Sequence, residues 1–213
     1  MIDPQALSSL LDKEGFDSGD AAVPLAGYLD LLMRWNKVMN LVGAHSWQDA
    51  LKRLIVDSFH LATFIRTLPL AASPLCWDLG SGAGLPGIPL RMLWQEGDYW
   101  LIEAREKRAL FMSTALARHP LPGTRVFRGR MEHFFSTPQG SAANLVVSRA
   151  FMPWMELLAV LPDRLRPGGL AIFLLNELPD LRQLPAAAQW HIHSSTSYGV
   201  AGQQRHLCAL QAR

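Results

Sequence analysis

The feature that most constrains the fold is a glycine-rich segment, CWDLGSGAGLPGIPL, at residues 76–90. A short apolar run, 75–79, leads into Gly80, Gly82 and Gly84, and a helical pattern follows. Glycine adopts positive φ angles without steric cost and lets the backbone approach a ligand closely. In a doubly wound sheet, the turn after the first strand lies at the carboxyl edge, where ligands bind. The segment therefore predicts a strand, a ligand-binding turn and a helix, rather than a tight turn with no ligand.

The rest of the second part of the chain alternates between short apolar runs and helical patterns. Strands that alternate with helices are typical of βαβ units and of a mostly parallel sheet covered on both faces. We therefore expect an α/β, Rossmann-like core over residues 71–213. Its predicted strands are 75–79, 99–102, 124–127, 144–148, 170–175, 190–198 and 206–210, its helices are 105–118 and 153–165, and 167–169 is a predicted turn.

Residues 1–70 carry a helical pattern and predict an N-terminal helical extension. Pro4 suits a first helical turn, Asp20 is a candidate cap for a second helix, and a third helix is expected over 48–67. We expect Trp35 to pack between helices. Asn40 and Asp57 are candidates for holding the extension against the core.

Composition excludes several classes of protein. With 49% hydrophobic and 18% charged residues, the chain can fill a core and is not intrinsically disordered. No apolar run reaches the ~18 residues of a membrane span, and the start lacks the basic region of a secretory signal. Cys76 and Cys208 each stand alone, which excludes a disulfide framework. We expect a cytoplasmic protein without a membrane partner and, by default, a monomer.

Residues beside the glycines indicate which ligand the turn binds. Residues 82–87 fit the dinucleotide fingerprint G-x-G-x-x-G, but counted from Gly80, where the strand should end, the last position is Leu85. Pro86 also removes a backbone donor that a pyrophosphate needs at a helix start. Asp78 would repel a pyrophosphate but attract the cationic amino group of a methionine moiety. The pattern D-x-G-x-G-x-G therefore favours S-adenosylmethionine over NAD.

Glu103 ends the next predicted strand, about 20 residues after the glycines, where an acidic residue can bind both ribose hydroxyls. Both cofactors contain adenosine, so Glu103 does not separate them. Its structural alternative is an acid favoured at a helix N-terminus, but its spacing from the glycines favours the ribose role.

Basic residues gather after the second predicted strand and are a modest indication of a phosphate-bearing partner, with a solvated helix face as the alternative. Arginine can bind phosphate and stack on bases. The candidates for nucleic-acid contact are Arg34, Lys37, Arg53, Arg105, Lys107, Arg108, Arg125, Arg128, Arg130 and Arg205.

Several motifs together resemble one family, the RsmG (GidB) small-subunit ribosomal RNA methyltransferases of bacteria. The resemblance runs from about Leu29 to Leu210. GLPGIPL, after the glycines, is much more specific than the general cofactor motif. The motifs are RWNK at 34–37, NL at 40–41, DS at 57–58, DLGSGAGLPGIPL at 78–90, KR at 107–108 with Phe111, RME at 130–132, SRAF at 148–151 and RHL at 205–207.

The resemblance implies a class I methyltransferase that uses S-adenosylmethionine to methylate N7 of one guanine in 16S rRNA, with 16S rRNA or the small ribosomal subunit as its partner. The resemblance implies cofactor contacts at Gly80, Leu85, Met131, Glu132 and Arg149, which join Asp78, Gly82, Gly84 and Glu103 from the argument above. The structural alternative to a cofactor contact for Arg149 is an ion pair with Glu132 or Asp78.

Two positions depart from the family pattern. A lysine usual after the fifth strand is Asn176 here, which bears on substrate affinity or rate, and a histidine usual before the Asp-Ser pair is Leu54. Neither departure touches the cofactor motif.

Guanine N7 has an in-plane lone pair and no proton, so methyl transfer to it needs alignment of two reactants rather than a general base. Accordingly, the sequence carries no Ser/His/Asp set, no Cys/His pair and no metal-ligand cluster, and we assign no catalytic residue and no metal. Two alternatives stay open: an NAD-linked oxidoreductase that uses the same turn, and a non-catalytic ribosome-binding protein with a retained pocket. The missing lysine at position 176 is the only feature that favours the latter.

Overall fold

A seven-stranded sheet forms the centre of the computed structural model, which describes residues 1–183 and 190–212. The strand order is β3-β2-β1-β4-β5-β7-β6; the pairs from β3 to β5 are parallel, and β7 runs antiparallel to β5 and to β6. The expected mostly parallel sheet is therefore confirmed. The strands are β1 (Leu75–Leu79), β2 (Asp98–Glu103), β3 (Thr124–Arg128), β4 (Ala143–Arg149), β5 (Leu165–Leu175), β6 (Trp190–Val200) and β7 (Gln203–Ala212).

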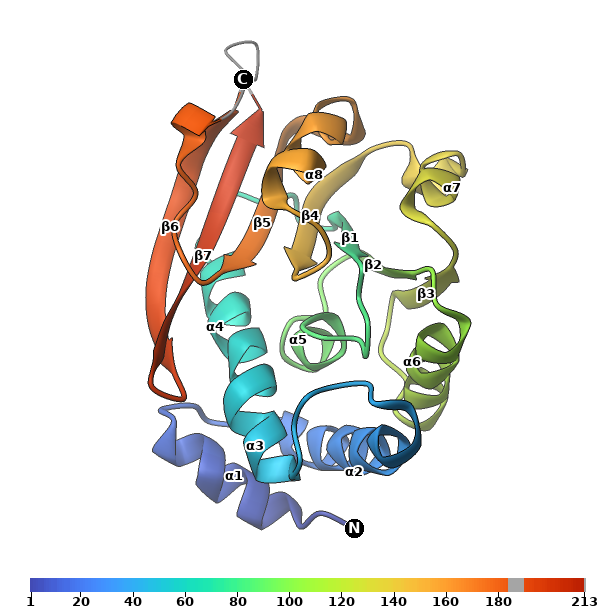
Figure 1. The fold of residues 1–213 in the computed structure, drawn as a ribbon, viewed down its shortest axis with the longest axis vertical. Helices are drawn as coiled ribbons and strands as arrows, with labels where there is room; N and C mark the ends of the chain where they lie inside the picture. The colour runs from blue at the N-terminus through green and yellow to red at the C-terminus, as the bar shows by residue number, and fades with distance from the viewer. Residues whose placement is uncertain (184–189, 213) are drawn as a thin grey trace.

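Helices cover both faces of this sheet, with α7 and α8 on one side and α1, α2, α4, α5 and α6 on the other (Figure 1). Of the helices in the described ranges, none is long and apolar enough to cross a membrane. The helices are α1 (Pro4–Lys13), α2 (Ala22–Met39), α3 (Trp47–Ala50), α4 (Val56–Ile65), α5 (Gly87–Leu93), α6 (Glu106–Arg118), α7 (Met131–Phe135) and α8 (Trp154–Val160).

The buried strands face two hydrophobic clusters, one on each side of the sheet. Cys76 belongs to the cluster under α4 and α5, whereas the next residue, Trp77, belongs to the cluster under α7 and α8. Leu145 and Val146 on β4 divide in the same way. Successive side chains of a strand point to opposite faces, and here both faces are apolar, so the sequence of each strand is a nearly continuous hydrophobic run.

Two helix boundaries in the extension differ from the prediction. Asp20 does not cap α2, because it lies inside a 3₁₀ turn, Gly19–Ala21, that runs directly into the helix. The helix expected over 48–67 is divided by a π-helical turn, Leu51–Ile55, between α3 and α4. Such turns insert one extra residue per turn and are frequent beside functional sites.

Two elements of the core also differ. The helix expected over 153–165 ends at Val160, and a 3₁₀ turn that begins with Pro162 follows it. Strand β5 begins at Leu165 rather than at Leu170, and the predicted turn 167–169 lies within it as an irregularity. There the pairing with β4 jumps from Ala143–Leu165 to Leu145–Leu170, which leaves the proline and glycines out of the regular ladder.

The extension packs against the core as part of one continuous hydrophobic cluster that includes Leu7, Leu29, Ile55 and Leu101. Trp35 contacts the ring of Phe111 on α6 with centroids 5.5 Å apart, which confirms its packing role. Division of the chain into 1–70 and 71–213 stays a prediction.

Two asparagines close the end of α2. Asn40 takes a left-handed conformation (φ 49°) as the C-terminal cap, and Asn36 holds the following loop by accepting from Val42 N–H and donating to the Ala44 carbonyl. No hydrogen bond from the Asn40 side chain to a described residue of the core supports the holding role that we expected for it.

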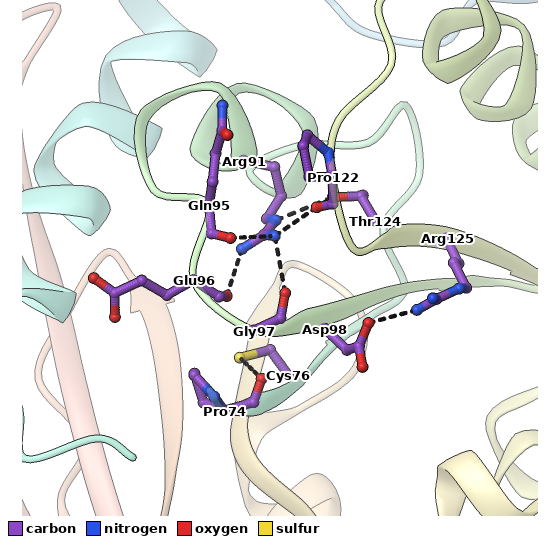
Figure 2. A network of polar contacts seen from close by, with 10 residues as sticks. All are labelled: Pro74, Cys76, Arg91, Gln95, Glu96, Gly97, Asp98, Pro122, Thr124 and Arg125. Atoms are coloured by element: carbon purple, nitrogen blue, oxygen red, sulfur yellow. Dashed lines mark hydrogen bonds and ion pairs between the residues drawn. The ribbon is translucent and has the colours of Figure 1, made fainter. Parts of the chain in front are cut away.

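A buried arginine holds together the loops at the amino ends of the strands. Arg91, at the end of α5, is completely buried, and its guanidinium donates to five backbone carbonyls and to the Thr124 hydroxyl. Figure 2 shows all of these acceptors except the Trp94 carbonyl. Because the acceptors lie in the loop between α5 and β2 and at the start of β3, this one side chain joins three elements at the edge of the sheet opposite the glycine-rich turn. The carbonyls belong to Trp94, Gln95, Glu96, Gly97 and Pro122, at 2.7–3.1 Å.

Candidate functional site

The glycine-rich turn needs its glycines for conformation and for close packing. Gly80, Gly82 and Gly84 all have positive φ angles, of 74°, 59° and 77°. A Cβ atom at Gly80 would lie 2.2 Å from the Phe151 ring, and one at Gly84 would lie 2.4 Å from Ile88. At Gly82 the space is open, and the Arg108 guanidinium lies 3.7 Å from where a Cβ would stand. The middle of the turn is thus left accessible.

Glu103 fastens the end of β2 to this turn. Its carboxylate accepts a hydrogen bond from Gly82 N–H at 2.9 Å and one from Arg105 N–H at 2.8 Å. The side chain is buried, at 7% exposure, although it lies on the wall of a cavity. An acidic group that is already fixed by two backbone donors has a defined orientation, which suits it to bind a polar ligand.

A cavity of about 390 Å³ opens at the carboxyl ends of β1, β2 and β4, beside the turn. Four of the predicted site residues line it: Gly80, Glu103, Met131 and Glu132. Gly82 adjoins it through its bond to Glu103. The cavity is lined by Gly80, Ile102, Glu103, Ala104, Arg105, Arg108, Gly129, Arg130, Met131, Glu132, Ala150 and Phe151. We call it the cofactor cavity.

Asp78 does not line this cavity. The alternation along β1 turns its side chain toward α5, where its carboxylate meets Gly87: a Cβ there would stand 2.3 Å from Asp78 Oδ2. Asp78 is 1% exposed, and no described side chain or backbone group forms a hydrogen bond to its carboxylate oxygens. Burial raises the pKa of Asp78 to about 7, and it outweighs the nearby Ser81 hydroxyl, the Gly87 N–H and then the charge of Arg149, which act in the opposite direction. The expectation that Asp78 faces the ligand is therefore not supported by its position.

This raised pKa predicts how stability depends on pH. A carboxyl whose pKa is higher in the folded chain than in the unfolded chain binds more protons when folded. The contribution of Asp78 to stability is present in full below its pKa in the unfolded chain, about 4. It is lost as the pH rises through its pKa in the folded chain, about 7. We expect Asp78→Asn, which stays neutral, to gain stability relative to the wild type between pH 5 and pH 8 in urea unfolding. Asp98→Asn, at an exposed carboxylate, is the control; a pH-independent difference for Asp78→Asn would contradict the assignment.

Gly84 and Leu85 shape the turn from its inner side and do not line the cofactor cavity either. Leu85 is buried in the cluster beneath α5. Two side chains of the extension hold this inner side: the Tyr28 hydroxyl donates to the Ala83 carbonyl at 2.7 Å, and the Ser58 hydroxyl donates to the Pro86 carbonyl at 3.0 Å. Sequence reasoning missed both, because nothing near Tyr28 or Ser58 in the chain indicates a partner in the distant turn.

Arg149 lies in a second cavity, of about 450 Å³, beyond the end of β4. Both cavities are bordered by Ala150, whose φ is 49°, so the chain at the end of β4 separates them. The second cavity is lined by Asp57, Arg149, Ala150, Met152, Pro153, Trp154, Leu174, Leu175, Asn176 and Arg205. We call it the distal cavity. Arg149 is thus beside the cofactor cavity rather than in its wall.

Asp57 organises the inner end of the distal cavity. Its Oδ2 accepts from Arg149 Nη1 at 3.0 Å and from Arg205 Nη1, and its Oδ1 accepts from the Tyr198 hydroxyl at 3.1 Å. The ion pair of Arg149 is therefore with Asp57, and with neither of the acids considered as the structural alternative. These contacts tie α4 to β4, β6 and β7, which confirms that Asp57 holds the extension against the core.

Seven of the ten basic candidates fall into two groups, and Arg205 lines the distal cavity. Arg105, Arg108 and Arg130 line the cofactor cavity. Others form ion pairs on the surface, where such pairs add little to stability: these are Arg34 with Asp30, Arg53 with Asp49, Arg125 with Asp98 and Arg128 with Glu106.

The fold is shared with solved methyltransferases. A ribosomal protein L11 methylase from Lactobacillus delbrueckii superposes with a TM-score of 0.57 at 16% identity, covering 81% of each chain. A SAM-dependent methyltransferase from Aquifex aeolicus gives a TM-score of 0.54 at 14% identity, covering 76% of this chain and 92% of the other. At these identities the likeness shows the class I methyltransferase fold, which the sequence predicted.

Sequence comparison is more specific. A protein named Ribosomal RNA small subunit methyltransferase G from Nitratidesulfovibrio vulgaris (strain DP4) is 49% identical, over 99% of this chain and 94% of the relative. A protein of the same name from Lawsonia intracellularis is also 49% identical, over 92% of this chain and 90% of the relative. A namesake from Xanthomonas campestris pv. campestris (strain B100) is 33% identical over 96% of this chain and 93% of its own. The GidB family, described as rRNA small subunit methyltransferase G, matches residues 23–208. Since that match takes in the glycine-rich turn, both cavities and the Asp57 contacts, the chain belongs to the GidB family of small-subunit rRNA methyltransferases.

Proposed function

We propose that this protein transfers the methyl group of S-adenosylmethionine to N7 of a guanine in the 16S rRNA of the small ribosomal subunit. The observation that carries the proposal is the Glu103 carboxylate, which is fixed to the glycine-rich turn and lies on the wall of the cofactor cavity. This is the place where a class I fold offers an acid to ribose hydroxyls. Family membership and the names of the relatives support the substrate.

The residues of the cofactor cavity fit S-adenosylmethionine. Glu103 would hold the ribose, Met131 and Glu132 would border the adenine, and the open backbone at Gly80 and Gly82 would accommodate the methionine part. When bound, the cofactor supplies an electrophilic methyl group on a sulfonium centre. Asp78, Gly84 and Leu85 would act indirectly, because they shape the turn from beneath.

The distal cavity is the proposed acceptor site. It adjoins the cofactor cavity across Ala150, so a guanine that enters it approaches the cofactor from the other side of this short segment. The half-buried Trp154 offers an aromatic surface in its wall. Because N7 carries no proton, these residues need only orient the base and exclude water, and none has to act as a general base. Arg149, at the boundary between the two cavities, is proposed as a cofactor contact from the acceptor side.

A direct experiment separates this proposal from its alternatives. We expect isothermal titration calorimetry to detect S-adenosylhomocysteine binding and no NADH binding; the reverse result would favour an oxidoreductase. Small subunits from cells that lack this protein provide an unmethylated substrate. We also expect the purified protein to transfer labelled methyl groups from S-adenosylmethionine to one guanine of these subunits. Absence of label in naked 16S rRNA, assembling particles and mature subunits would favour a non-catalytic ribosome-binding protein. We further propose that the protein acts as a monomer in the cytoplasm, where this substrate is found.

Replacement of Glu103 by alanine should weaken cofactor binding by about 10- to 100-fold, the usual cost of losing charge-assisted hydrogen bonds. The variant loses the contacts to the ribose and also the acceptor that holds Gly82 N–H. The measurement is the dissociation constant of S-adenosylhomocysteine. Glu106→Ala is the matched control, since Glu106 lies three residues away, is exposed and pairs with Arg128 outside the cavity. Equal affinities of the two variants for S-adenosylhomocysteine would show that Glu103 does not bind the cofactor.

A further inference from the structure

Two side chains from distant parts of the chain hold the middle of the glycine-rich turn at adjacent residues. The Glu103 carboxylate accepts from Gly82 N–H at 2.9 Å, on the side of the cofactor cavity. The Tyr28 hydroxyl donates to the Ala83 carbonyl at 2.7 Å, on the inner side. Glu103 ends β2, whereas Tyr28 lies on α2, in the N-terminal extension. The extension therefore supplies one of the two contacts that fix this part of the turn.

The position of the Tyr28 hydroxyl is itself well defined. Tyr28 is completely buried in the cluster under α4 and α5, and its ring centroid lies 6.0 Å from that of Phe111 on α6. Burial raises the pKa of Tyr28, so the hydroxyl keeps its proton and remains a donor. A buried tyrosine needs a partner for its polar end, and the Ala83 carbonyl is that partner. The ring is thus a rigid arm that reaches from α2 to the turn.

The two hydroxyls that reach the turn from the extension are not equivalent. Within the described residues, the Ala83 carbonyl accepts from Tyr28 and from no backbone N–H, and Ala83 is 4% exposed. The Pro86 carbonyl accepts from the Ser58 hydroxyl at 3.0 Å, but it also accepts from Leu90 N–H at 3.0 Å. Loss of the Tyr28 hydroxyl therefore leaves a buried acceptor without a donor, which is costly, whereas loss of the Ser58 hydroxyl leaves an acceptor that is still bonded.

We propose that Tyr28 is a positioning residue for the cofactor: it holds the glycine-rich turn in the conformation that binds S-adenosylmethionine. This inference rests on the proposed function. Tyr28 does not line the cofactor cavity, so it acts through Ala83 rather than by touching the cofactor. Without the hydroxyl, the Ala83 carbonyl turns toward another donor. That movement displaces Gly82, the neighbouring residue, and weakens its bond to Glu103. The helical extension thereby contributes to cofactor binding as well as to packing.

The test compares Tyr28→Phe with the wild type by isothermal titration calorimetry of S-adenosylhomocysteine. Phenylalanine keeps the ring and its contact with Phe111, so only the hydroxyl is removed. We expect the dissociation constant to rise about 5- to 50-fold. KM for S-adenosylmethionine should rise in parallel, with little change in kcat at saturating cofactor or in KM for unmethylated small subunits. Thr67→Val is the matched control: the Thr67 hydroxyl donates to the Phe64 carbonyl at 2.7 Å, within the extension, and its loss should leave cofactor affinity unchanged.

Two further comparisons separate positioning from a general loss of stability. Calorimetry gives the number of sites as well as the affinity, so a partly unfolded sample lowers the number of sites and not the affinity of the folded molecules. Ser58→Ala should weaken cofactor binding less than Tyr28→Phe, because Leu90 N–H still bonds the Pro86 carbonyl.

A double-variant cycle tests whether the two contacts act on one turn. In the Glu103→Ala background Gly82 is already released, so Tyr28→Phe should cost less cofactor affinity there than in the wild type. Wild-type affinity in Tyr28→Phe, or fully additive losses in the double variant, would overturn the positioning role. A wild-type protein that binds no S-adenosylhomocysteine and labels no RNA would instead defeat the proposed function, so the two failures are distinguishable.

Discussion

Replacement of Arg91 by methionine is expected to lower the free energy of unfolding by about 3–4 kcal/mol, near the upper end of single-substitution effects. Five carbonyl groups and the Thr124 hydroxyl lose their shared donor. Each acceptor that stays buried without a partner costs about 1–3 kcal/mol. Residues 95, 96 and 122 are exposed, so water will satisfy part of the set and keep the loss below the sum. Methionine keeps most of the side-chain volume, so the measured effect reports the hydrogen bonds.

Urea unfolding followed by circular dichroism measures this loss. Arg66→Met is the control, because Arg66 is exposed and donates one bond, to the Leu93 carbonyl at 2.6 Å, at the same end of the molecule. We expect the control to cost less than about 1 kcal/mol. The Arg91 contacts lie at the amino ends of the strands, so cofactor affinity of the folded variant should be unchanged. A loss for Arg91→Met as small as that of the control would show that the loops hold together without the guanidinium.

Replacement of Asp57 by alanine should cost about 3–5 kcal/mol, the usual result of removing one partner from a buried ion pair. Asp57 is 1% exposed and accepts from Arg149, Arg205 and Tyr198, so its loss leaves two guanidinium groups facing each other without a counter-charge. The same contacts join α4 to β4, β6 and β7, and the variant should loosen the extension as well as the distal cavity. Thermal and urea unfolding measure the loss.

Two comparisons isolate the electrostatic part of this effect. Asp49→Ala removes the acid of an exposed pair with Arg53, one helical turn apart, and should cost less than about 1 kcal/mol. Combining Asp57→Ala with Arg205→Met should recover part of the stability, because one of the two unpaired charges is then absent. Added phosphate should also stabilise Asp57→Ala more than the wild type. Additive losses in the double variant would show that the Asp57 effect comes from packing rather than from charge.

Features that depend on neighbouring residues were predictable from the sequence. The strand, the three glycines and the following helix belong together because positive φ angles at Gly80, Gly82 and Gly84 are a local requirement. The alternation of strands and helices likewise predicted a mostly parallel sheet. Boundaries were less accurate: the π-helical turn within the third helix and the irregular start of β5 arise from how these segments pack, and their local patterns look regular.

Pairings between distant residues were not predictable. The structural alternative for Arg149 was an ion pair with Glu132 or Asp78, yet its partner is Asp57, 92 residues earlier in the chain. Asp78 was expected to face the ligand, but the alternation along β1 and the position of α5 turn it into the interior. Many acids in this chain have charge suited to either arginine, and only the packing of the extension on the sheet brings one of them within reach.

The sequence by itself determined the glycine-rich turn, the order of strands and helices, and the family, because each depends on residue types at short, fixed spacing. Only the tertiary structure decided which face each strand residue takes, which acid neutralises which arginine, and that two cavities meet at Ala150. The physical reason is that local conformation follows from the preferences of adjacent residues, whereas a site is assembled from segments whose proximity depends on burying the whole apolar surface at once.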